Sequence, residues 1–220
     1  LAQDPLKITG VTDPFGRSAQ FSYSADGHLA SVRDVLGITS SYQYGANDFI
    51  QTLSTPYGST QFAYGDRSTD VNLGTARFLT ATDPAGRTSR VEYRDRAAGM
   101  PYSDTNVPAG IATFNAFIDY RNSFSWTPEQ LAGGIDYTKA TQFHFLHAAS
   151  SERSSGITGR TIESIKKPLE RRQWYSYLGQ SGQNAAGFEG TSSLVKASAR
   201  LLSDGTTQLV KREFNSKGNV

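Results

Sequence analysis

The chain contains no cysteine, and this absence excludes both a disulfide framework and a thiolate metal site. Outside a cell its stability would therefore have to come from packing. No apolar run approaches the roughly 20 residues that a helix needs to cross a bilayer. The first residues, Leu1-Ala2-Gln3-Asp4, carry neither a basic region nor an apolar export core. We therefore expect no membrane span in this segment.

A strong charge of one sign is also missing. Lysine and arginine number 22 against 20 aspartates and glutamates, which leaves a formal net charge of +2. The charges are scattered, so a nucleic-acid backbone is not indicated as a partner. The pairs Lys166-Lys167 and Arg171-Arg172 form too short a basic cluster to change this. No glycine loop of the phosphate-binding type occurs in the sequence.

Candidate chemical sites are few. His144 and His147 are the only close histidine pair, and the strand-like alternation of 141–145 would send them to opposite faces as ordinary sheet residues. Gly179-Gln180-Ser181-Gly182 lacks the spacing of a nucleophile elbow and is expected to be a turn. Asp13 and Asp83 precede turn prolines and should cap their own backbone. The sequence thus predicts no catalytic, cofactor-binding or metal-binding residue and no enzyme.

What the chain does contain is a repeat. Two turn signals, Asp13-Pro14-Phe15-Gly16 and Ala25-Asp26-Gly27, separate short alternating runs over 8–27, and the turn glycines Gly16, Gly37 and Gly58 follow one another every 21 residues. A fourth copy contains Gly86, after a short insertion that includes Asn72-Leu73-Gly74. A late copy runs from Pro168 to Tyr177, with Glu170 in place of the turn glycine. Each copy predicts one β-hairpin.

The repeat predicts a sheet with one aromatic face. Rings at alternate positions, such as Phe21 and Tyr23, share a face that we expect to be buried, while the residues between them should meet solvent. Those intervening residues are Ser22, Gln43, Ala63, Glu92 and Ser176. Because one hairpin is marginal alone, successive hairpins should join into a long, curled antiparallel sheet, an all-β fold. The expected structural positions are Gly16, Gly37, Gly58 and Gly86 in turns and the rings Phe21, Tyr23, Tyr42, Tyr44, Phe62, Tyr64, Tyr93, Tyr175 and Tyr177 in strands.

The repeats are regular over residues 8–95 and resume over residues 161–220, and the repeat period is lost between these two stretches. The intervening 96–160 predicts long loops with a short helix, in which Thr127 is the N-cap, Pro128 opens the helix and Gln130 closes a capping box. Gly133-Gly134 should end that helix. Ile111 to Asp119 and Thr138 to His147 are expected to be strands. We interpret residues 1–220 as a single segment of a repeat array.

The repeated pattern Asp-Pro-x-Gly-Arg, followed by an aromatic or β-branched residue and Tyr two positions later, resembles the YD repeat of the Rhs family. Relatives include the B and C components of insecticidal toxin complexes and the animal teneurins. The resemblance implies a β-strand ribbon that spirals into a hollow shell or barrel. In bacterial members such a shell encloses a C-terminal toxic polypeptide that self-cleavage releases, and in teneurins it serves adhesion. Nothing in the chain resembles the self-cleaving segment or a toxin domain.

The resemblance implies a non-catalytic scaffold that encloses or presents another part of a larger bacterial protein, secreted or at the cell surface. Its partners would be the remaining repeats of the same polypeptide and an enclosed C-terminal toxin or other cargo. The chain lacks an initiator Met and begins and ends inside repeat material, so we expect a fragment of a longer polypeptide, with any export signal outside it. The alternative is an adhesion module that binds a glycan or a surface protein, because 11 tyrosines and 12 phenylalanines could supply exposed rings. Their strand periodicity favours sheet packing.

Overall fold

A computed structural model describes residues 4–66, 76–148, 157–180, 190 and 192–219, and it shows an all-β protein. Its strands form one unclosed antiparallel sheet of 14 strands, which lie in the order of the chain. This confirms the predicted fold class of hairpin repeats. The strands are β1 (Gly10–Thr12), β2 (Ser18–Tyr23), β3 (Leu29–Arg33), β4 (Thr39–Tyr44), β5 (Ile50–Thr55), β6 (Gly58–Asp66), β7 (Ala76–Thr82), β8 (Thr88–Arg96), β9 (Tyr120–Trp126), β10 (Thr141–Ala148), β11 (Ile157–Lys166), β12 (Gln173–Tyr177), β13 (Val195–Leu201) and β14 (Thr207–Lys211).

The chain divides into two compact units. Unit 1 comprises Leu1–Tyr64 and Leu79–Ser89, and unit 2 comprises Gly65–Phe78 and Arg90–Val220. The described part of the irregular stretch 96–160 belongs to unit 2, while the organisation of the chain as one repeat array stays a prediction. No helix in the described ranges is long and apolar enough to cross a membrane. The predicted Asn72-Leu73-Gly74 insertion lies outside the described residues.

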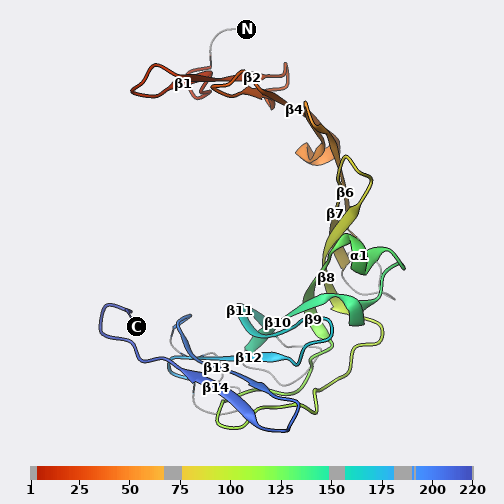
Figure 1. The fold of residues 1–220 in the computed structure, drawn as a ribbon, viewed down its shortest axis with the longest axis vertical. Helices are drawn as coiled ribbons and strands as arrows, with labels where there is room; N and C mark the ends of the chain where they lie inside the picture. Colours follow the sequence, from red (N-terminus) through yellow and green to blue (C-terminus); the bar gives the residue numbers. More distant parts are fainter. Residues whose placement is uncertain (1–3, 67–75, 149–156, 181–189, 191, 220) are drawn as a thin grey trace. The chain divides into compact units, whose positions relative to one another are not determined.

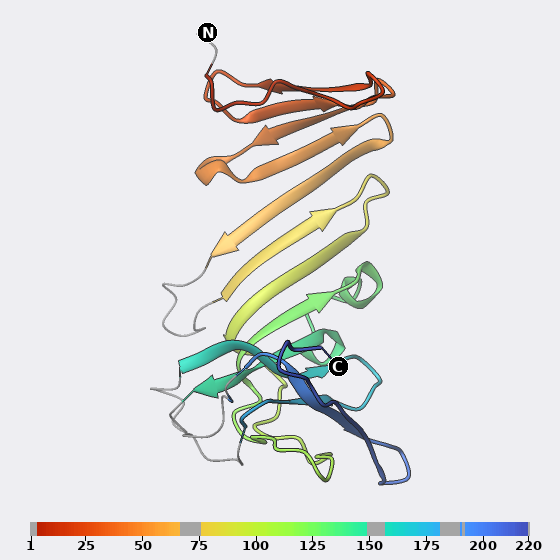
Figure 2. The same cartoon turned by 90° about the vertical axis from the view of Figure 1, so that its left-hand side faces the viewer.

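Unit 1 consists of hairpins whose turns are held by an aspartate. Figure 2 shows its strands side by side in chain order. The Asp13 carboxylate accepts hydrogen bonds from the backbone N–H groups of Phe15 (2.9 Å) and Arg17 (3.0 Å), and from the Arg17 guanidinium (2.7 Å). Asp83 repeats these contacts with Ala85 and Arg87. The prediction that both aspartates cap their own turns is confirmed, and the Arg17 hydrogen bond lowers the pKa of Asp13.

The glycine of each such turn has a left-handed backbone, with φ of 80° at Gly16, 84° at Gly37 and 78° at Gly86. A Cβ at Gly86 would meet no atom within 4 Å, so a substitution there tests backbone strain without a steric clash. We expect Gly86→Ala to destabilise the protein by about 1–2 kcal/mol in urea denaturation. Gly133→Ala is the control, because its Cβ would also be free of contacts and its φ is not positive. Equal effects of the two substitutions would contradict this account.

The aromatic face of unit 1 is less buried than predicted. Thr52 is the single buried residue among the described residues of unit 1, whereas Phe21, Tyr42 and Phe62 are half-buried and Tyr64 is 42% exposed. The intervening residues Ser22, Gln43 and Ala63 are exposed, as predicted. Prediction of a fully buried face was wrong because no second layer covers the sheet within the described part of this unit.

Hydroxyl groups of the repeat tyrosines bridge strands. The Tyr23 hydroxyl donates to the carbonyl of Ile8 (2.8 Å), and the Tyr44 hydroxyl donates to the carbonyl of Leu29 (3.0 Å). In unit 2 the Tyr177 hydroxyl donates in the same way to Ile162. Each donor lies 15 residues after its acceptor, so one periodic contact recurs in both units. At these three positions phenylalanine would lose the bond.

We expect Tyr44→Phe to lower the free energy of unfolding by about 0.5–1.5 kcal/mol, since the Leu29 carbonyl loses its side-chain donor. Tyr42→Phe is the matched control on the same strand. No hydrogen bond joins the Tyr42 hydroxyl to another residue of the described part of the chain. Urea denaturation of both variants measures the difference. If Tyr42→Phe destabilised the protein as much as Tyr44→Phe, the contribution of the interstrand bond would be refuted.

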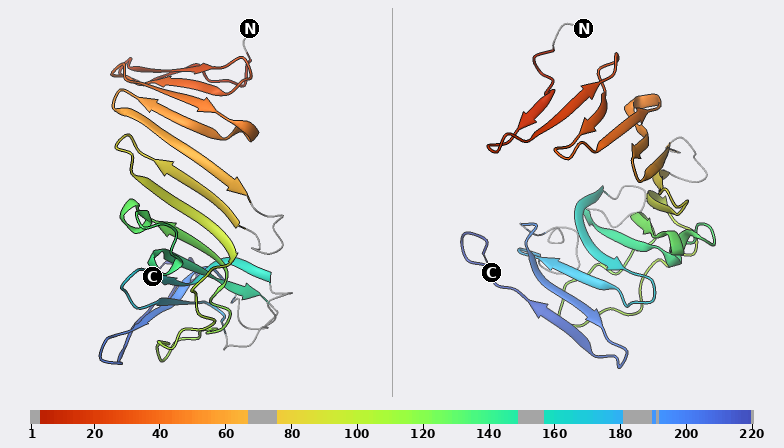
Figure 3. Two further views of the ribbon diagram at one scale, coloured as in Figure 1. Left: turned by 90° about the vertical axis from the view of Figure 1, so that its right-hand side faces the viewer. Right: turned by 45° about the horizontal axis from the view of Figure 1, so that its top comes forward.

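Unit 2 has a core because an irregular segment covers one face of its sheet. Segment 97–119, yellow-green in Figures 1 and 3, runs beside strands β9 to β14. Its Ile118 is fully buried, and the N–H of Ala109 donates to the Thr207 hydroxyl at the start of β14 (2.9 Å). A second cover lies after β9, where Tyr137 packs edge-on against the ring of Phe124 (4.8 Å between centroids) and near Trp126.

Because these segments cover one face of the sheet, the buried and exposed faces of two strands are the reverse of those predicted. Glu92 and Ser176 were expected to meet solvent, but they are 2% and 6% exposed, while Val91 is 50% exposed. In β8 the residues paired with Phe124 and Trp126 of β9 are Glu92 and Arg90, so these two lie on the covered face. The covered face of unit 2 is thus the one opposite to the face that carries Val91 and Tyr175.

The irregular stretch itself was predicted in part. Helix α1 (Pro128–Leu131) has the expected capping box between Thr127 and Gln130, and Gly134 follows it with φ of 92°, which confirms the predicted helix and its end. The strand predicted over Ile111–Asp119 is wrong. Those residues form no strand, because their backbone bonds instead to side chains of the sheet, and the strand is β9, which begins at Tyr120.

The second predicted strand of this stretch, Thr138–His147, corresponds to β10, which begins at Thr141 after the short 3-10 helix η2 (Tyr137–Lys139). In the late repeat copy the left-handed position falls on Leu169 (φ 61°) and not on Glu170, which stands where the other copies have glycine. At the predicted turn 179–182, Gly179 has φ of 78°, while Ser181 and Gly182 lie outside the described residues.

Candidate functional site: a buried polar cluster under segment 97–119

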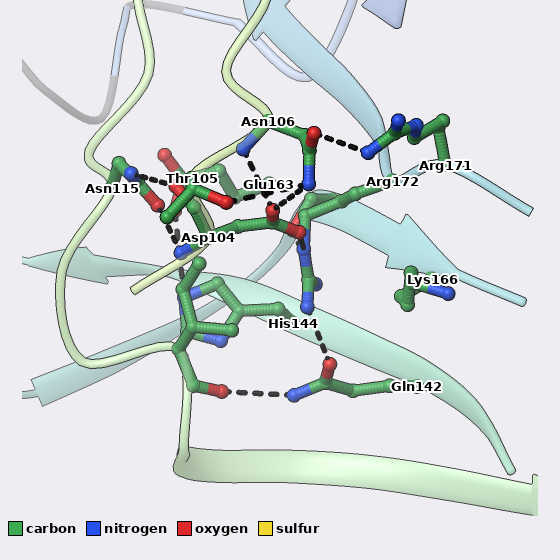
Figure 4. Close-up of polar contacts among 12 residues, drawn as sticks. Asp104, Thr105, Asn106, Asn115, Gln142, His144, Glu163, Lys166, Arg171 and Arg172 are labelled. Carbon is green, nitrogen blue, oxygen red and sulfur yellow. Dashed lines mark hydrogen bonds and ion pairs between the residues drawn. The ribbon is translucent and has the colours of Figure 1, made fainter. Parts of the chain in front are cut away.

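A group of polar side chains lies between segment 97–119 and the covered face of unit 2. We call it the buried polar cluster, and Figure 4 shows most of its members. The strands place these side chains together because Asn122 of β9 pairs with His144 of β10, which pairs with Ser164 of β11, which pairs with Trp174 of β12. The cluster consists of Asp104, Asn122, Gln142, His144, Glu163, Ser164 and Arg172.

Arg172 lies at the centre of the cluster and is only 2% exposed. Its guanidinium donates to Asp104 Oδ2 (3.2 Å), to the Ser164 hydroxyl (3.1 Å) and to Gln142 Oε1 (2.7 Å). Burial lowers the pKa of Arg172, and the neighbouring Asp104 opposes this shift. Burial also disfavours the charged form of Asp104, but hydrogen bonds from Asn106 and the charge of Arg172 bring its pKa below the usual range. The pair therefore stays ionised.

Two amide side chains hold the backbone of the covering segment. Gln142 Nε2 donates to the carbonyl of Ile118 (2.8 Å), and Asn122 Nδ2 donates to the same carbonyl (2.7 Å). Gln142 thus links Arg172 to the segment. All three groups are buried, so their hydrogen bonds are shielded from water and are strong.

Glu163 meets the covering segment from the other side. Its Oε1 accepts the backbone N–H of Phe114 (2.6 Å), and its Oε2 lies 3.5 Å from Nε2 of His144. Burial raises the pKa of Glu163 to about 8, although the Phe114 hydrogen bond and the charge of Arg172 act in the opposite direction. Glu163 is therefore mainly protonated at pH 7.

The tautomer of His144 follows from its neighbours. Asn122 uses its Nδ2 on Ile118, so its Oδ1, 2.7 Å from Nδ1 of His144, accepts a hydrogen bond from that nitrogen. In a neutral ring Nε2 is then the basic nitrogen, and it faces the protonated carboxyl of Glu163. The Glu163 carboxyl, the His144 ring and the Asn122 amide thus lie next to one another, and His144 and Glu163 are 0% exposed. The arrangement fastens the segment to the sheet.

Sequence reasoning missed this cluster. His144 was expected to be an ordinary sheet residue, and Arg172 was considered only with Arg171 as part of a short basic cluster, whereas Arg171 is exposed and Arg172 is buried. The side chain of His147 lies outside the described residues. A signal was present in β10, where Gln142 and His144 alternate with Phe143 and Phe145, although nothing local says which set is covered. No group of three or more histidine, aspartate or glutamate residues in the described ranges could hold a metal ion.

Residues 23–60 match the family model described as RHS Repeat. This match supports an Rhs-type repeat in the chain. The matched residues run from the end of β2 into β6 and include the hydroxyl donor Tyr44 and the turn glycines Gly37 and Gly58. No curated protein matches the chain significantly.

The structural positions that the sequence singled out make specific contacts in the structure. Tyr23, Tyr44 and Tyr177 bridge strands through their hydroxyls. Tyr64 stacks on Phe49 (4.4 Å between ring centroids), and the Tyr93 hydroxyl donates to Asp95 (3.3 Å). Gly58 differs from the other turn glycines, because its turn has only the two residues Pro56 and Tyr57 between β5 and β6. The chain is thus a structural repeat protein.

Proposed function

We propose that this chain forms part of the wall of an Rhs-type β-shell, which encloses or presents another part of a larger, exported bacterial protein of the toxin type. The mechanism is containment and involves no chemistry on a substrate. The observation that carries the proposal is the strand order, in which every strand pairs with its neighbours in sequence. Each added repeat extends such a sheet by two strands, so wall area grows with repeat number.

The contacts of the repeat support this proposal. Turn aspartates and tyrosine hydroxyls fix the register between neighbouring strands, and neither requires a second layer. A single-layer sheet whose strands are joined by such side-chain hydrogen bonds is suited to form a wall between the inside and the outside of a shell. In unit 2 the covering segment belongs to the same chain and lies on one face, so the opposite face, with Tyr175, is left for other contacts.

The test is a cryo-electron microscopy structure of the longest natural polypeptide that contains this chain. We expect density from another segment of that polypeptide inside a closed sheet. A matching biochemical result would be protection of that segment from protease in the intact protein, lost when the Tyr23 and Tyr44 bridges are removed together by Tyr→Phe substitutions. An open sheet with no enclosed segment would overturn the proposal.

An adhesion role is the second candidate, and exposed rings favour it. Phe15 and Tyr57 at turn tips are 83% and 79% exposed, and Tyr64 is 42% exposed. Exposed aromatic faces can stack on sugars or pack against a surface protein. An open sheet in the parent protein, together with binding to a glycan array that Tyr57→Ser reduces, would support this role over containment.

A further inference from the structure

The face of unit 2 opposite to segment 97–119 carries a groove of about 480 Å³ across strands β11 to β14. Its floor includes Tyr175 and Val210, which alternate with residues of the covered face. Tyr175 is half-buried and Val210 is 47% exposed, so the groove offers apolar surface between polar walls.

Four cations line this groove: Lys167, Arg171, Arg200 and Arg212. They come from three places in the sequence, which the sheet brings together. The single acidic residue in the lining is Glu170, and it lies 3.9 Å from Lys167. The groove therefore has an excess of positive charge, although the chain as a whole is nearly neutral.

Among the residues that the structure describes, the three groove arginines differ from most other arginines in having no carboxylate partner. Arg171 donates to the amide oxygen of Asn106 and Arg200 donates to that of Gln208 (2.7 Å), and Arg212 forms no ion pair with any residue that the structure describes. Arginines with a carboxylate within 4.0 Å occur elsewhere on the sheet and in its turns; they are Arg17, Arg77, Arg87, Arg90, Arg94, Arg121 and Arg172.

We infer that this groove binds an acidic polypeptide segment, whose aspartate and glutamate carboxylates pair with Arg171, Arg200 and Arg212. A guanidinium offers a planar fork that matches a carboxylate, so three arginines without a carboxylate partner among the described residues select for a ligand with several carboxylates. The aliphatic stems of such a ligand would lie against Tyr175 and Val210. A nucleic acid fits less well, because a phosphate backbone needs a continuing basic track and the charge excess is confined to the groove.

The experiment uses the whole chain and a fluorescently labelled hexaglutamate peptide, with binding followed by anisotropy. We expect saturable binding that weakens with salt. The double substitution Arg200→Gln with Arg212→Gln should weaken it about tenfold or more, since two charge-assisted hydrogen-bonding sites are lost. Lys211→Gln with Lys217→Gln is the matched control. It removes the same net charge, but Lys211 lies on the other face of β14 and Lys217 lies in a turn, so binding should be unchanged.

Circular dichroism establishes whether the variants are folded. If the double variant were unfolded, Arg171→Gln would replace it, because Arg171 is exposed and its loss leaves the core intact; a loss of affinity of several-fold is then expected. Equal peptide binding by the groove variant and the wild type would overturn the inference. Tighter binding of an oligothymidylate or a heparin hexasaccharide at the same residues would also overturn it, in favour of a phosphate or sulfate polymer.

Discussion

Replacing Arg172 by Met should lower the free energy of unfolding by about 3–5 kcal/mol. The substitution keeps the length of the side chain but removes the cation, and it leaves Asp104, Ser164 and Gln142 without their donor. A buried carboxylate that loses its partner must either remain charged in a poor environment or take up a proton. Urea denaturation monitored by tryptophan fluorescence is suitable, because Trp174 is fully buried beside Arg172.

Arg77→Met is the control for this prediction. It breaks an ion pair with Asp66 in the same unit, but both side chains are substantially exposed, so the loss should be below about 1 kcal/mol. Adding Asp104→Asn to Arg172→Met should restore part of the stability, since the uncompensated charge is gone. A loss below 1 kcal/mol for Arg172→Met, with no rescue by Asp104→Asn, would show that the cluster does not hold the segment.

Glu163→Gln should change how stability depends on pH. Glu163 has an ordinary pKa of 4.5 and a folded-state pKa of about 8, so the folded protein binds its proton more tightly than the unfolded chain. Its contribution is fully present below pH 4.5 and is lost as the pH rises through about 8. Glutamine cannot ionise, and its amide oxygen can still accept the N–H of Phe114. The variant should therefore come closest to the wild type at pH 5 and clearly exceed its stability at pH 9.

Denaturation midpoints measured from pH 5 to pH 9 provide the readout, and the difference between variant and wild type isolates the titration of Glu163. Glu170→Gln is the control, since it also replaces a carboxylate by an amide but at an exposed turn position outside the cluster. If the stability difference between the wild type and Glu163→Gln were the same at pH 5 and at pH 9, Glu163 would not have a raised pKa.

Local chemistry was readable from the sequence wherever neighbours in the chain determine the structure. The turn aspartates, the left-handed glycines and the capping box of Thr127 and Gln130 all depend on residues within four positions of one another. The strand order could also be predicted from the sequence. Because the repeats are short, the nearest available partner of each hairpin is the next hairpin along the chain.

Burial could not be predicted in the same way, because it depends on what covers the sheet. Alternation in β8 separates Val91 from Glu92 but does not say which of them is covered, and segment 97–119 with its neighbours covers the side of Glu92. Likewise, the contacts of Arg172 with Asp104 and of Glu163 with Phe114 join residues 68 and 49 positions apart. No periodic pattern encodes such contacts, and the polar cluster therefore had no sequence signature of its own.

The strand order also bears on how the chain reaches its fold. Strands that pair only with their sequence neighbours give contacts of short range, which form faster than the distant pairings of most β proteins. A chain emerging from the ribosome can thus add one strand at a time to a sheet already formed. Segment 97–119 is the exception, because Ala109 finds its partner Thr207 only 98 residues later. The buried polar cluster can close once Arg172 is in place, but the docking of the segment is complete only when β14 has been added.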